Sequence, residues 1–406
     1  MTGASAPSPL PGIDSSCPMS AEEAMPELSL LGGPLHRLGC RLGLVRRGTN
    51  TLGLGLTFGM LGWGVLILLA LLEGLVSKMF SLSAIGSHVR LLLAIPLLFL
   101  CETWVFPEMA EFVRYMVRSG LVPEASLPVL ASDIRLVCRL KDSWLAEGFF
   151  LVAALVLPMI MPTAIVPGKA TGWAWVHSPG AKLTWADGWY LGLCLPLFRF
   201  LLFRWLWRLG LWWYFLWRVE KLPLRLVSAH SDGAAGLGYL EFVQGLFAPF
   251  VVAISAVYSA GFAEDISSGA MPFEGLYRLV PMVLLMIAVL FISPLLIFSR
   301  KLAICHLTGM SEYMGMASRY VIAFDRKWIR NEKASGESQL GSPDVQALGD
   351  LTCSVDVVRN MRWIPAGRRL MTGLAASVLL PLLPLLLLKF PAEQLVARLL
   401  KLLTGF

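Results

Sequence analysis

Two kinds of residue in this sequence could do chemistry: a histidine and an aspartate in a glycine-rich stretch, and charged side chains inside apolar runs. The glycine-rich stretch reads HSDGAAGLGY and precedes an apolar run. A helix start after glycines offers free backbone N–H groups and a positive dipole end, which suit a phosphate or carboxylate. The pattern predicts an anion or headgroup loop built from His230, Asp232, Gly233, Gly236 and Gly238.

A structural interpretation of the same loop competes with this one. Asp232 or Ser231 can cap the following helix, and the glycines can allow close helix packing. A catalytic role for His230 and Asp232 needs a nucleophile with a base and an orienting group, and none can be proposed around them. The GK[ST] of a nucleotide loop is also absent. We therefore assign no catalytic residue.

The deepest charges in the apolar runs are Arg199 and Glu102. At 1.5 Å per residue, Arg199 lies about 15 Å from Trp189 and Glu102 lies about 17 Å from Leu91, the first residues of their runs. Ionisable groups at such depth usually have a partner or face water. The matching depths predict that Arg199 and Glu102 form an ion pair or share one polar cavity.

A second layer of charge lies nearer the cytoplasmic boundary. Arg204 and Arg208 are one turn apart on one helix face, and Glu241 and Glu108 fall at comparable depth. Arginines near a boundary extend to headgroups, and tryptophans there form an aromatic belt. We therefore expect snorkelling and structural pairing in this layer, and belts formed by the tryptophans between positions 173 and 217.

The composition indicates which elements must position these residues. Hydrophobic residues make up 56% of the 406-residue chain and charged residues 15%, with a mean hydropathy of +0.69. In soluble domains about a quarter of all residues are charged. The sequence thus predicts an all-α, polytopic membrane bundle whose main partner is the lipid bilayer. The net charge of +7 does not indicate a nucleic-acid partner, because basic residues of membrane proteins collect on the cytoplasmic side.

About 20 apolar residues are needed to cross a bilayer core. Seven segments qualify, namely Leu52–Val76, Leu91–Phe112, Phe149–Val166, Trp189–Gly210, Leu237–Ala260, Leu279–Phe298 and Met371–Leu388. With the N-terminus inside, 23 of the 34 Lys and Arg residues fall in inner segments and eight in outer ones. This bias predicts an N-terminus in and a C-terminus out.

The domain organisation follows from these segments. We expect a largely disordered cytoplasmic tail over 1–50 and a six-span region over 51–299 with a cytoplasmic helix near 123–147. A cytoplasmic helical segment over 300–370 follows, and 371–406 holds the last span and an outer interfacial helix. The cytoplasmic stripe from Val345 to Met361 has helical spacing, so it must bury against something. We expect it to pack with the amphipathic helix of Pro123–Trp144, or to recruit a cytoplasmic protein partner.

The seven cysteines and five histidines show no ligand spacing. No CxxC pair occurs, which argues against a zinc site and a disulfide framework. The sequence predicts no metal site and no cofactor.

The stretch around the glycine loop resembles a known signature. LPLRLVSAHSDGAAGLGYL is similar to the HPDxxGGLGFL motif of bacterial multi-pass inner-membrane proteins, a group without an established activity. The segment that begins LGSPDVQALGDL resembles their cytoplasmic segment before the last span. Ser231 and Ala235 depart from the motif's proline and its first paired glycine. The resemblance implies a bacterial inner-membrane location and no specific activity.

Three functional hypotheses remain open from the sequence. Charge at depth favours a solute or ion pathway with Arg199 and Glu102 at its polar centre. The amphipathic segment over 300–370 favours a non-catalytic scaffold or regulatory component. A lipid-active membrane enzyme has only His230 and Asp232 to support it.

Overall fold

The protein is helical throughout the computed structural model, which describes residues 26–32, 34–41, 43, 51–160, 184–330 and 343–389. No strand occurs in these ranges, so the predicted helical membrane bundle is confirmed. Six helical stretches in the described chain are long and apolar enough to cross a membrane: Leu52–Leu72, Leu82–Arg118, Trp185–Glu220, Gly238–Ser267, Phe273–Leu296 and Arg368–Leu388.

The first span is a single helix, α2 (Leu52–Leu72), whereas the others combine several helical pieces. The second span consists of η1 (Leu82–Ala84), α4 (Ile85–His88), η2 (Val89–Ala94) and α5 (Ile95–Arg118). The third span consists of α8 (Trp185–Trp189), η4 (Tyr190–Cys194) and α9 (Leu195–Glu220). The last three are α10 (Gly238–Gly245) with α11 (Ala248–Ser267), η5 (Phe273–Gly275) with α12 (Leu276–Leu296), and α15 (Arg368–Leu379) with η7 (Leu380–Leu388).

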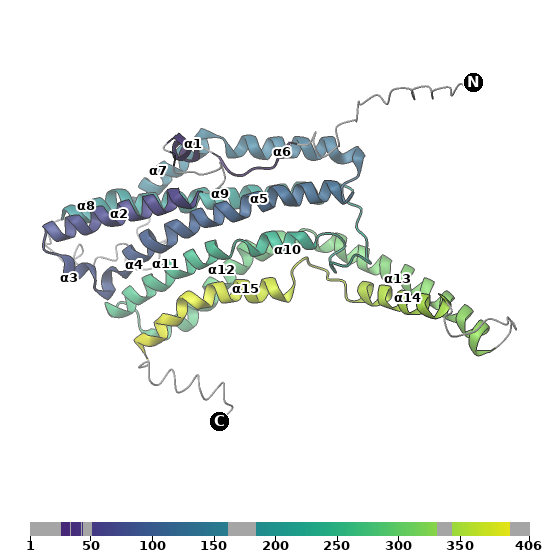
Figure 1. The fold of residues 1–406 in the computed structure, drawn as a ribbon. Helices are drawn as coiled ribbons and strands as arrows, with labels where there is room; N and C mark the ends of the chain where they lie inside the picture. Colours follow the sequence, from purple (N-terminus) through teal and green to yellow (C-terminus); the bar gives the residue numbers. More distant parts are fainter. Residues whose placement is uncertain are drawn as a thin grey trace, which may run out of the picture.

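The segment predicted as the third of seven spans is described only in part. Its described portion is α7 (Trp144–Ile160), whose apolar stretch Trp144–Leu157 is shorter than a bilayer requires. The rest of that predicted span lies outside the described residues, as do most of the predicted N-terminal tail and the predicted outer interfacial helix. Because α5 and α9 run in the same direction, the chain between them has to return to the other end of the bundle (Figure 1).

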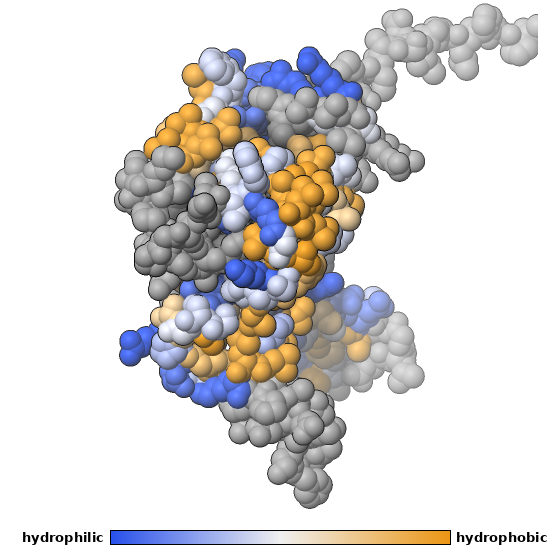
Figure 2. Space-filling view, turned by 90° about the vertical axis from the view of Figure 1, so that its left-hand side faces the viewer, coloured by the Kyte–Doolittle hydropathy of each residue, from blue (hydrophilic) through white to orange (hydrophobic). Residues whose placement is uncertain are grey.

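The spans lie side by side along their lengths, with α3 (Val76–Met79) at one end of the bundle (Figure 1). We call this the outer end, following the orientation that the charge distribution predicts. Figure 2 faces that end, where hydrophilic and hydrophobic residues are interspersed. Beyond the opposite, inner end, α13 (Ser299–Phe324) and α14 (Pro343–Arg359) project as an antiparallel pair.

The two predicted amphipathic helices have different partners. The helix α6 (Leu127–Lys141) packs against α9, and a short α1 (Pro34–Arg41) lies near it (Figure 1). The helix α14 packs against α13, where it buries Val355 and Val358. The prediction that α6 and α14 pack together was wrong, because the helix that follows the fifth described span continues past the bundle and offers α14 a surface of its own.

The helices α5 and α9 begin in the same unusual way. Each is preceded by a π-helical turn, η2 or η4, and each carries a proline at its second residue, Pro96 or Pro196. Proline lacks the N–H donor and its ring clashes with the carbonyl four residues earlier. A wider π turn relieves that clash, and such turns occur often at functional sites. The turns therefore have a local cause in the sequence.

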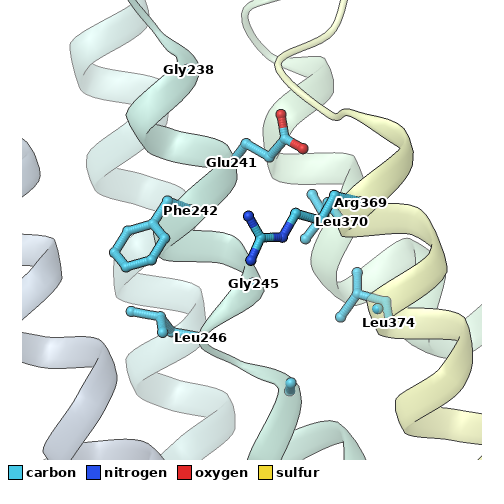
Figure 3. A pocket seen from close by; sticks show the side chains of 10 residues that line it. Gly238, Glu241, Phe242, Gly245, Leu246, Arg369, Leu370 and Leu374 are labelled. Carbon is cyan, nitrogen blue, oxygen red and sulfur yellow. The ribbon is translucent and has the colours of Figure 1, made fainter. Parts of the chain in front are cut away.

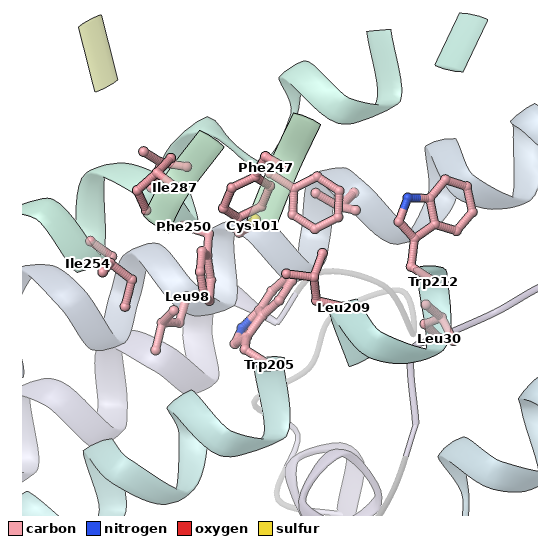
Figure 4. Packing of buried hydrophobic residues seen from close by; sticks show 14 of the residues in the cluster. Leu30, Leu98, Cys101, Trp205, Leu209, Trp212, Phe247, Phe250, Ile254 and Ile287 are labelled. Atoms are coloured by element: carbon pink, nitrogen blue, oxygen red, sulfur yellow. The ribbon is translucent and has the colours of Figure 1, made fainter. Parts of the chain in front are cut away.

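The core is aromatic and lies between α5, α9, α11 and α12 (Figure 4). Trp205 stacks on Phe106 at a centroid distance of 5.5 Å and also contacts Phe250 at 5.3 Å. Trp205 and Trp212 are fully buried. The predicted tryptophan belt is therefore wrong for these two residues, which fill the protein interior, whereas Trp185 and Trp217 are exposed as a belt requires.

Candidate functional site

Two buried polar clusters occupy the bundle, and the first joins α5 to α9. Glu102 Oε1 accepts hydrogen bonds from Arg204 Nη1 at 3.0 Å and from Arg208 Nη1 at 2.6 Å. The three residues are between 2 and 3% exposed. Arg208 also lies over the Phe106 ring, with its guanidinium carbon 4.9 Å from the centroid. We call Glu102, Arg204 and Arg208, with Glu147, the inner cluster.

A segment from the predicted tail closes this cluster. The carbonyl of Gly32 accepts from Arg204 Nη2 and Arg208 Nη2, both at 3.0 Å. Leu28 and Leu30 are buried beside it, and the carbonyl of Leu31 accepts from Lys141 Nζ at 2.9 Å. Residues 26–32 thus pack on the bundle, which differs from the disordered tail expected over 1–50.

The inner cluster is balanced in formal charge. Glu147, in the first turn of α7, places Oε1 3.6 Å from Arg204 Nε, so two carboxylates face two guanidinium groups. Buried ions are tolerated when they are paired and hydrogen-bonded. The charges of the inner cluster are all paired, and the Nη donors of both arginines are hydrogen-bonded, whereas Arg204 Nε has only the ion pair with Glu147.

The predicted pairing of Glu102 with Arg199 is wrong, because Glu102 pairs with Arg204 and Arg208 instead. Arg199 precedes these arginines by five and nine residues, which at 3.6 residues per turn places it about 140° and 180° around the helix. The depth estimate failed too. The spans begin at Leu82 and Trp185, so Glu102 lies 20 positions and Arg204 19 positions from the respective starts.

The second cluster lies nearer the outer end and contains Arg199. Arg90 Nη1 donates to the Tyr190 hydroxyl at 2.6 Å, which joins the two π turns directly. Glu264, on α11, accepts from the Gly86 backbone N–H at 2.7 Å. Arg199 interacts electrostatically with Arg90 and Tyr190. We call Arg90, Tyr190, Arg199 and Glu264 the outer cluster.

The absence of a side chain at Gly86 allows this cluster to form. A Cβ atom at that position would lie 2.5 Å from Glu264 Oε1 and 2.9 Å from Arg90 Nη1. The carboxylate and the guanidinium therefore both lie against the Gly86 backbone, and a larger residue would displace them.

The outer cluster is incompletely paired. Arg90, Glu264 and Arg199 are 4%, 5% and 9% exposed. Among the described residues, Arg90 Nε, Arg199 Nε and Glu264 Oε2 have no hydrogen-bond partner. Arg90 interacts with Glu264, and Arg199 adds a second positive charge without an acidic partner among the described residues, so these four side chains carry an excess positive charge. The buried Asp187, three residues before Tyr190, uses its Oδ2 in the capping box of α8 with Thr184, and its Oδ1 has no hydrogen-bond partner among the described residues.

The sequence did not identify Arg90, Tyr190 or Glu264. Arg90 and Glu264 lay outside the predicted spans, which stopped at the apolar residues, whereas the helices continue through both. The sequence held one signal, a matched spacing: Pro96 follows Arg90 by six residues, and Pro196 follows Tyr190 by six residues. In the structure Arg90 and Tyr190 hydrogen-bond to each other.

The glycine loop holds an internal anion. Asp232 Oδ1 accepts from the Ala234 N–H at 2.8 Å, and Oδ2 accepts from the N–H groups of Gly236 and Gly238 at 3.1 and 2.7 Å. Ala235 and Gly236 have φ of 55° and 98°, a region that favours glycine. The N–H groups predicted to be free for a ligand are therefore occupied by the protein's own carboxylate.

His230 and Asp232 do contact each other, with Nδ1 and Oδ1 2.9 Å apart. Because both oxygens of Asp232 also accept backbone hydrogen bonds, its role in this geometry is to hold the loop. Gly233 contributes a turn with φ of 63°, and its carbonyl accepts from the Arg362 N–H at 2.8 Å.

The predicted inner-boundary glutamates have partners other than Arg204 and Arg208. Glu241 Oε2 accepts from Arg362 Nη1 at 2.5 Å, and Glu108 Oε2 accepts from the Tyr239 hydroxyl at 2.5 Å. Arg362 Nη2 donates to the Asp232 carbonyl at 3.0 Å. Arg362, which sequence reasoning missed, thus ties the chain before the last span to the glycine loop.

Within the described ranges, no group of three or more His, Cys, Asp and Glu side chains is arranged to hold a metal ion. The outer cluster is a buried polar site in which three described atoms lack a hydrogen-bond partner. Comparisons of the chain with protein-family models, with curated proteins and with solved structures found no match.

Proposed function

We propose that this multi-pass membrane protein binds a small anion at the outer cluster, and that the cluster is the polar centre of a solute pathway. By the resemblance of its glycine loop, we place it in a bacterial inner membrane. The pathway is in a closed state at its inner end, where Glu102, Arg204, Arg208 and the segment 26–32 fill the space between α5 and α9.

The excess positive charge of the outer cluster carries this proposal. A buried cation without a counter-charge is strongly unfavourable, and such residues inside a membrane usually serve a substrate or ion. The inner cluster shows that this chain neutralises arginines where they only hold helices together. Arg199, by contrast, has no acidic partner among the described residues. A ligand carboxylate, phosphate or halide would supply the missing charge.

The first test asks whether an anion stabilises the folded protein through Arg199. Thermal unfolding of the purified protein is followed in sodium chloride, phosphate or succinate at equal ionic strength. We expect one anion to raise the midpoint of the wild type above the others, because a ligand at a hundred times its Kd adds about 2.7 kcal/mol. Arg199→Gln should remove this difference.

Arg300→Gln is the matched control, since it removes an exposed arginine at the start of α13. It should keep the anion-specific difference of the wild type. Equal midpoints in all three anions for the wild type, or an unchanged difference in Arg199→Gln, would contradict anion binding at the outer cluster.

A second measurement concerns access from the outer side. In intact vesicles, a cysteine at position 199 should react with an impermeant sulfonate thiol reagent added outside. A cysteine at Leu201, which is buried in the core beside it, is the control and should not react. An unreactive cysteine at 199 would exclude the pathway while leaving a structural charge.

A second function is favoured by one surface. The projecting helix α13 exposes an apolar stripe at spacings of three and seven residues, formed by Ile304, Leu307, Met314 and Val321. That spacing is typical of a helix that pairs with another helix. A scaffold that recruits a helical partner here would lose that partner on Leu307→Glu and retain it on Arg319→Glu, which changes an exposed residue off the stripe, as a site-specific crosslink in cells would show.

A further inference from the structure

A cavity of about 460 Å³ lies between α10 and α15, at the inner end of the bundle (Figure 3). It is separate from both buried clusters. Its walls come from the start of the fourth described span and the start of the last one, since Gly238 and Arg368 begin these spans.

The cavity has a polar end and an apolar end. Arg369 and Glu241 stand at the level of the first turn of α15, while Leu246 and Leu374 line the part farther along the helices (Figure 3). Phe242, which is exposed on α10, also contributes to the lining. Gly245 and Gly373 leave room between the helices, and a Cβ at Gly373 would meet no atom within 4 Å.

The charge at the polar end is positive. Glu241 is already paired with Arg362 at 2.5 Å, so its charge is compensated. The guanidinium of Arg369 points from α15 into the cavity (Figure 3), and it forms no ion pair with the described residues. One cation of the lining is therefore available to an anionic group.

The start of α15 adds further donors. Its N-cap residue is Gly367, which provides no side-chain cap, so the backbone N–H groups of the first turn lack a capping acceptor. A Cβ at Gly367 would displace the ends of the Arg362 and Glu241 side chains, which lie against this backbone. An anion beside Arg369 would also meet the positive end of this helix.

We infer that this cavity binds an anionic phospholipid of the inner leaflet, with its phosphate on Arg369 and one acyl chain along Leu246 and Leu374. The combination of a cation at headgroup level with an apolar wall farther into the membrane matches the two ends of a lipid. A soluble anion would use the polar end alone. This inference does not depend on the anion site proposed for the outer cluster.

The experiment is a lipid titration by native mass spectrometry on the full-length protein in detergent, with phosphatidylglycerol or phosphatidylcholine. We expect the wild type to retain phosphatidylglycerol in preference to phosphatidylcholine. Arg369→Gln should weaken phosphatidylglycerol binding about ten-fold, because a charge-assisted hydrogen bond is lost. Gly373→Leu should weaken binding of the lipid by filling the cavity.

Two variants control for charge and for size. Arg368→Gln removes the neighbouring arginine, which does not line the cavity, and Gly210→Leu makes the same glycine change on α9, where a Cβ also meets nothing. Both should bind phosphatidylglycerol like the wild type. Unchanged binding in Arg369→Gln, or equal affinity for the two lipids, would overturn the headgroup assignment. Displacement of phosphatidylglycerol by glycerol phosphate alone, or unchanged binding in Gly373→Leu, would overturn the lipid in favour of a soluble anion.

Discussion

At the scale of single residues, one carboxylate oxygen serves two arginines. Arg204 and Arg208 both donate through Nη1 to Oε1 of Glu102, and the Gly32 carbonyl accepts a hydrogen bond from Nη2 of each arginine. Without the carboxylate, Glu147 would be the remaining negative charge for two buried cations. Glu102 is therefore the residue on which the inner cluster depends.

Glu102→Gln should destabilise the protein by about 3–5 kcal/mol, the usual cost of leaving a buried charge without its partner. Unfolding in a denaturing detergent, followed by tryptophan fluorescence, measures this loss. Glu312→Gln, which changes an exposed residue of α13, should be close to neutral. The double variant Glu102→Gln/Arg208→Gln should recover part of the loss, whereas Glu102→Gln/Arg199→Gln should show additive effects. Coupling of Glu102 to Arg199 instead would refute the observed pairing.

Asp232 holds the glycine loop through its charge. Burial alone would raise the pKa of this carboxyl, but hydrogen bonds from the N–H groups of Ala234, Gly238 and Gly236 outweigh burial and keep the pKa below its ordinary value. A carboxyl with a lowered pKa in the folded state contributes stability above its unfolded pKa, which is about 3.9. That contribution is lost as the pH falls through the lower, folded pKa.

The difference in unfolding midpoint between the wild type and Asp232→Asn should therefore shrink as the pH falls below about pH 4. Thermal unfolding across this range measures it. Asp350→Asn, at an exposed position on α14, should show no such difference. A difference that grows below about pH 4 would mean that the loop is not held by the ionised carboxylate.

At the scale of elements, the matched π turns orient the outer cluster. The turns η2 and η4 precede Pro96 and Pro196, and the side chains of Arg90 and Tyr190 meet between them. A π turn contains one residue more than an α turn, so it rotates the chain before it relative to the helix after it. The prolines thus determine which way Arg90 and Tyr190 point.

Pro196→Ala restores the N–H donor and removes the ring, so η4 can tighten to an α-helical turn and carry Tyr190 away from Arg90. Tyr190→Phe alone should cost about 1.5–3 kcal/mol, the usual value of a hydrogen bond to a charged group. In the Pro196→Ala background the same change should cost almost nothing. Unfolding free energies of the four proteins test this coupling.

Pro249→Ala is the control, because Pro249 stands at the start of α11, a helix not preceded by a π turn. Tyr190→Phe should keep its full cost in that background. An unchanged cost of Tyr190→Phe in the Pro196→Ala background would show that the proline does not set the direction of Tyr190.

At the scale of the whole molecule, the orientation in the membrane follows from charge and is testable with a native residue. Cys353 is exposed on α14, in the segment predicted to be cytoplasmic. An impermeant maleimide should label it in inverted membrane vesicles and not in intact cells, as mass spectrometry of its peptide would show. A cysteine at Ser268, exposed after α11, should show the opposite pattern. Labelling of Cys353 in intact cells would reverse the topology.

Hydropathy predicted most of the fold because it depends on local sequence. Each of the six described spans overlaps a predicted one, and the predicted helical stripe from Val345 to Met361 falls largely on α14. The boundaries were less accurate, since an apolar window ends at a charge such as Arg90 or Glu264, whereas the helix continues when protein covers that charge.

For the candidate site, the sequence predicted the types of residue and their location inside the membrane, but not which residues pair with each other. The sequence showed that arginines and a glutamate lie at membrane depth, and helical spacing alone separates Arg199 from Arg204 and Arg208 by about half a turn. It could not show that Glu102 faces the latter two, because that depends on where two spans distant in the chain begin relative to each other. Nor could it show that Asp232 fills the loop, since three backbone N–H groups converge only in the folded turn.

The sequence by itself therefore determined that this chain is a membrane protein of apolar helices with costly charges inside. The reason is that the free energy of transfer into lipid is, to a first approximation, a sum over individual residues. Tertiary structure alone decided which of these charges are neutralised. Arg204 and Arg208 meet carboxylates from α5 and α7, while Arg90 interacts with Glu264 of α11 and Arg199 has no acidic partner among the described residues. The physical reason is that pairing requires side chains on different helices to face each other at one depth, and packing sets that arrangement.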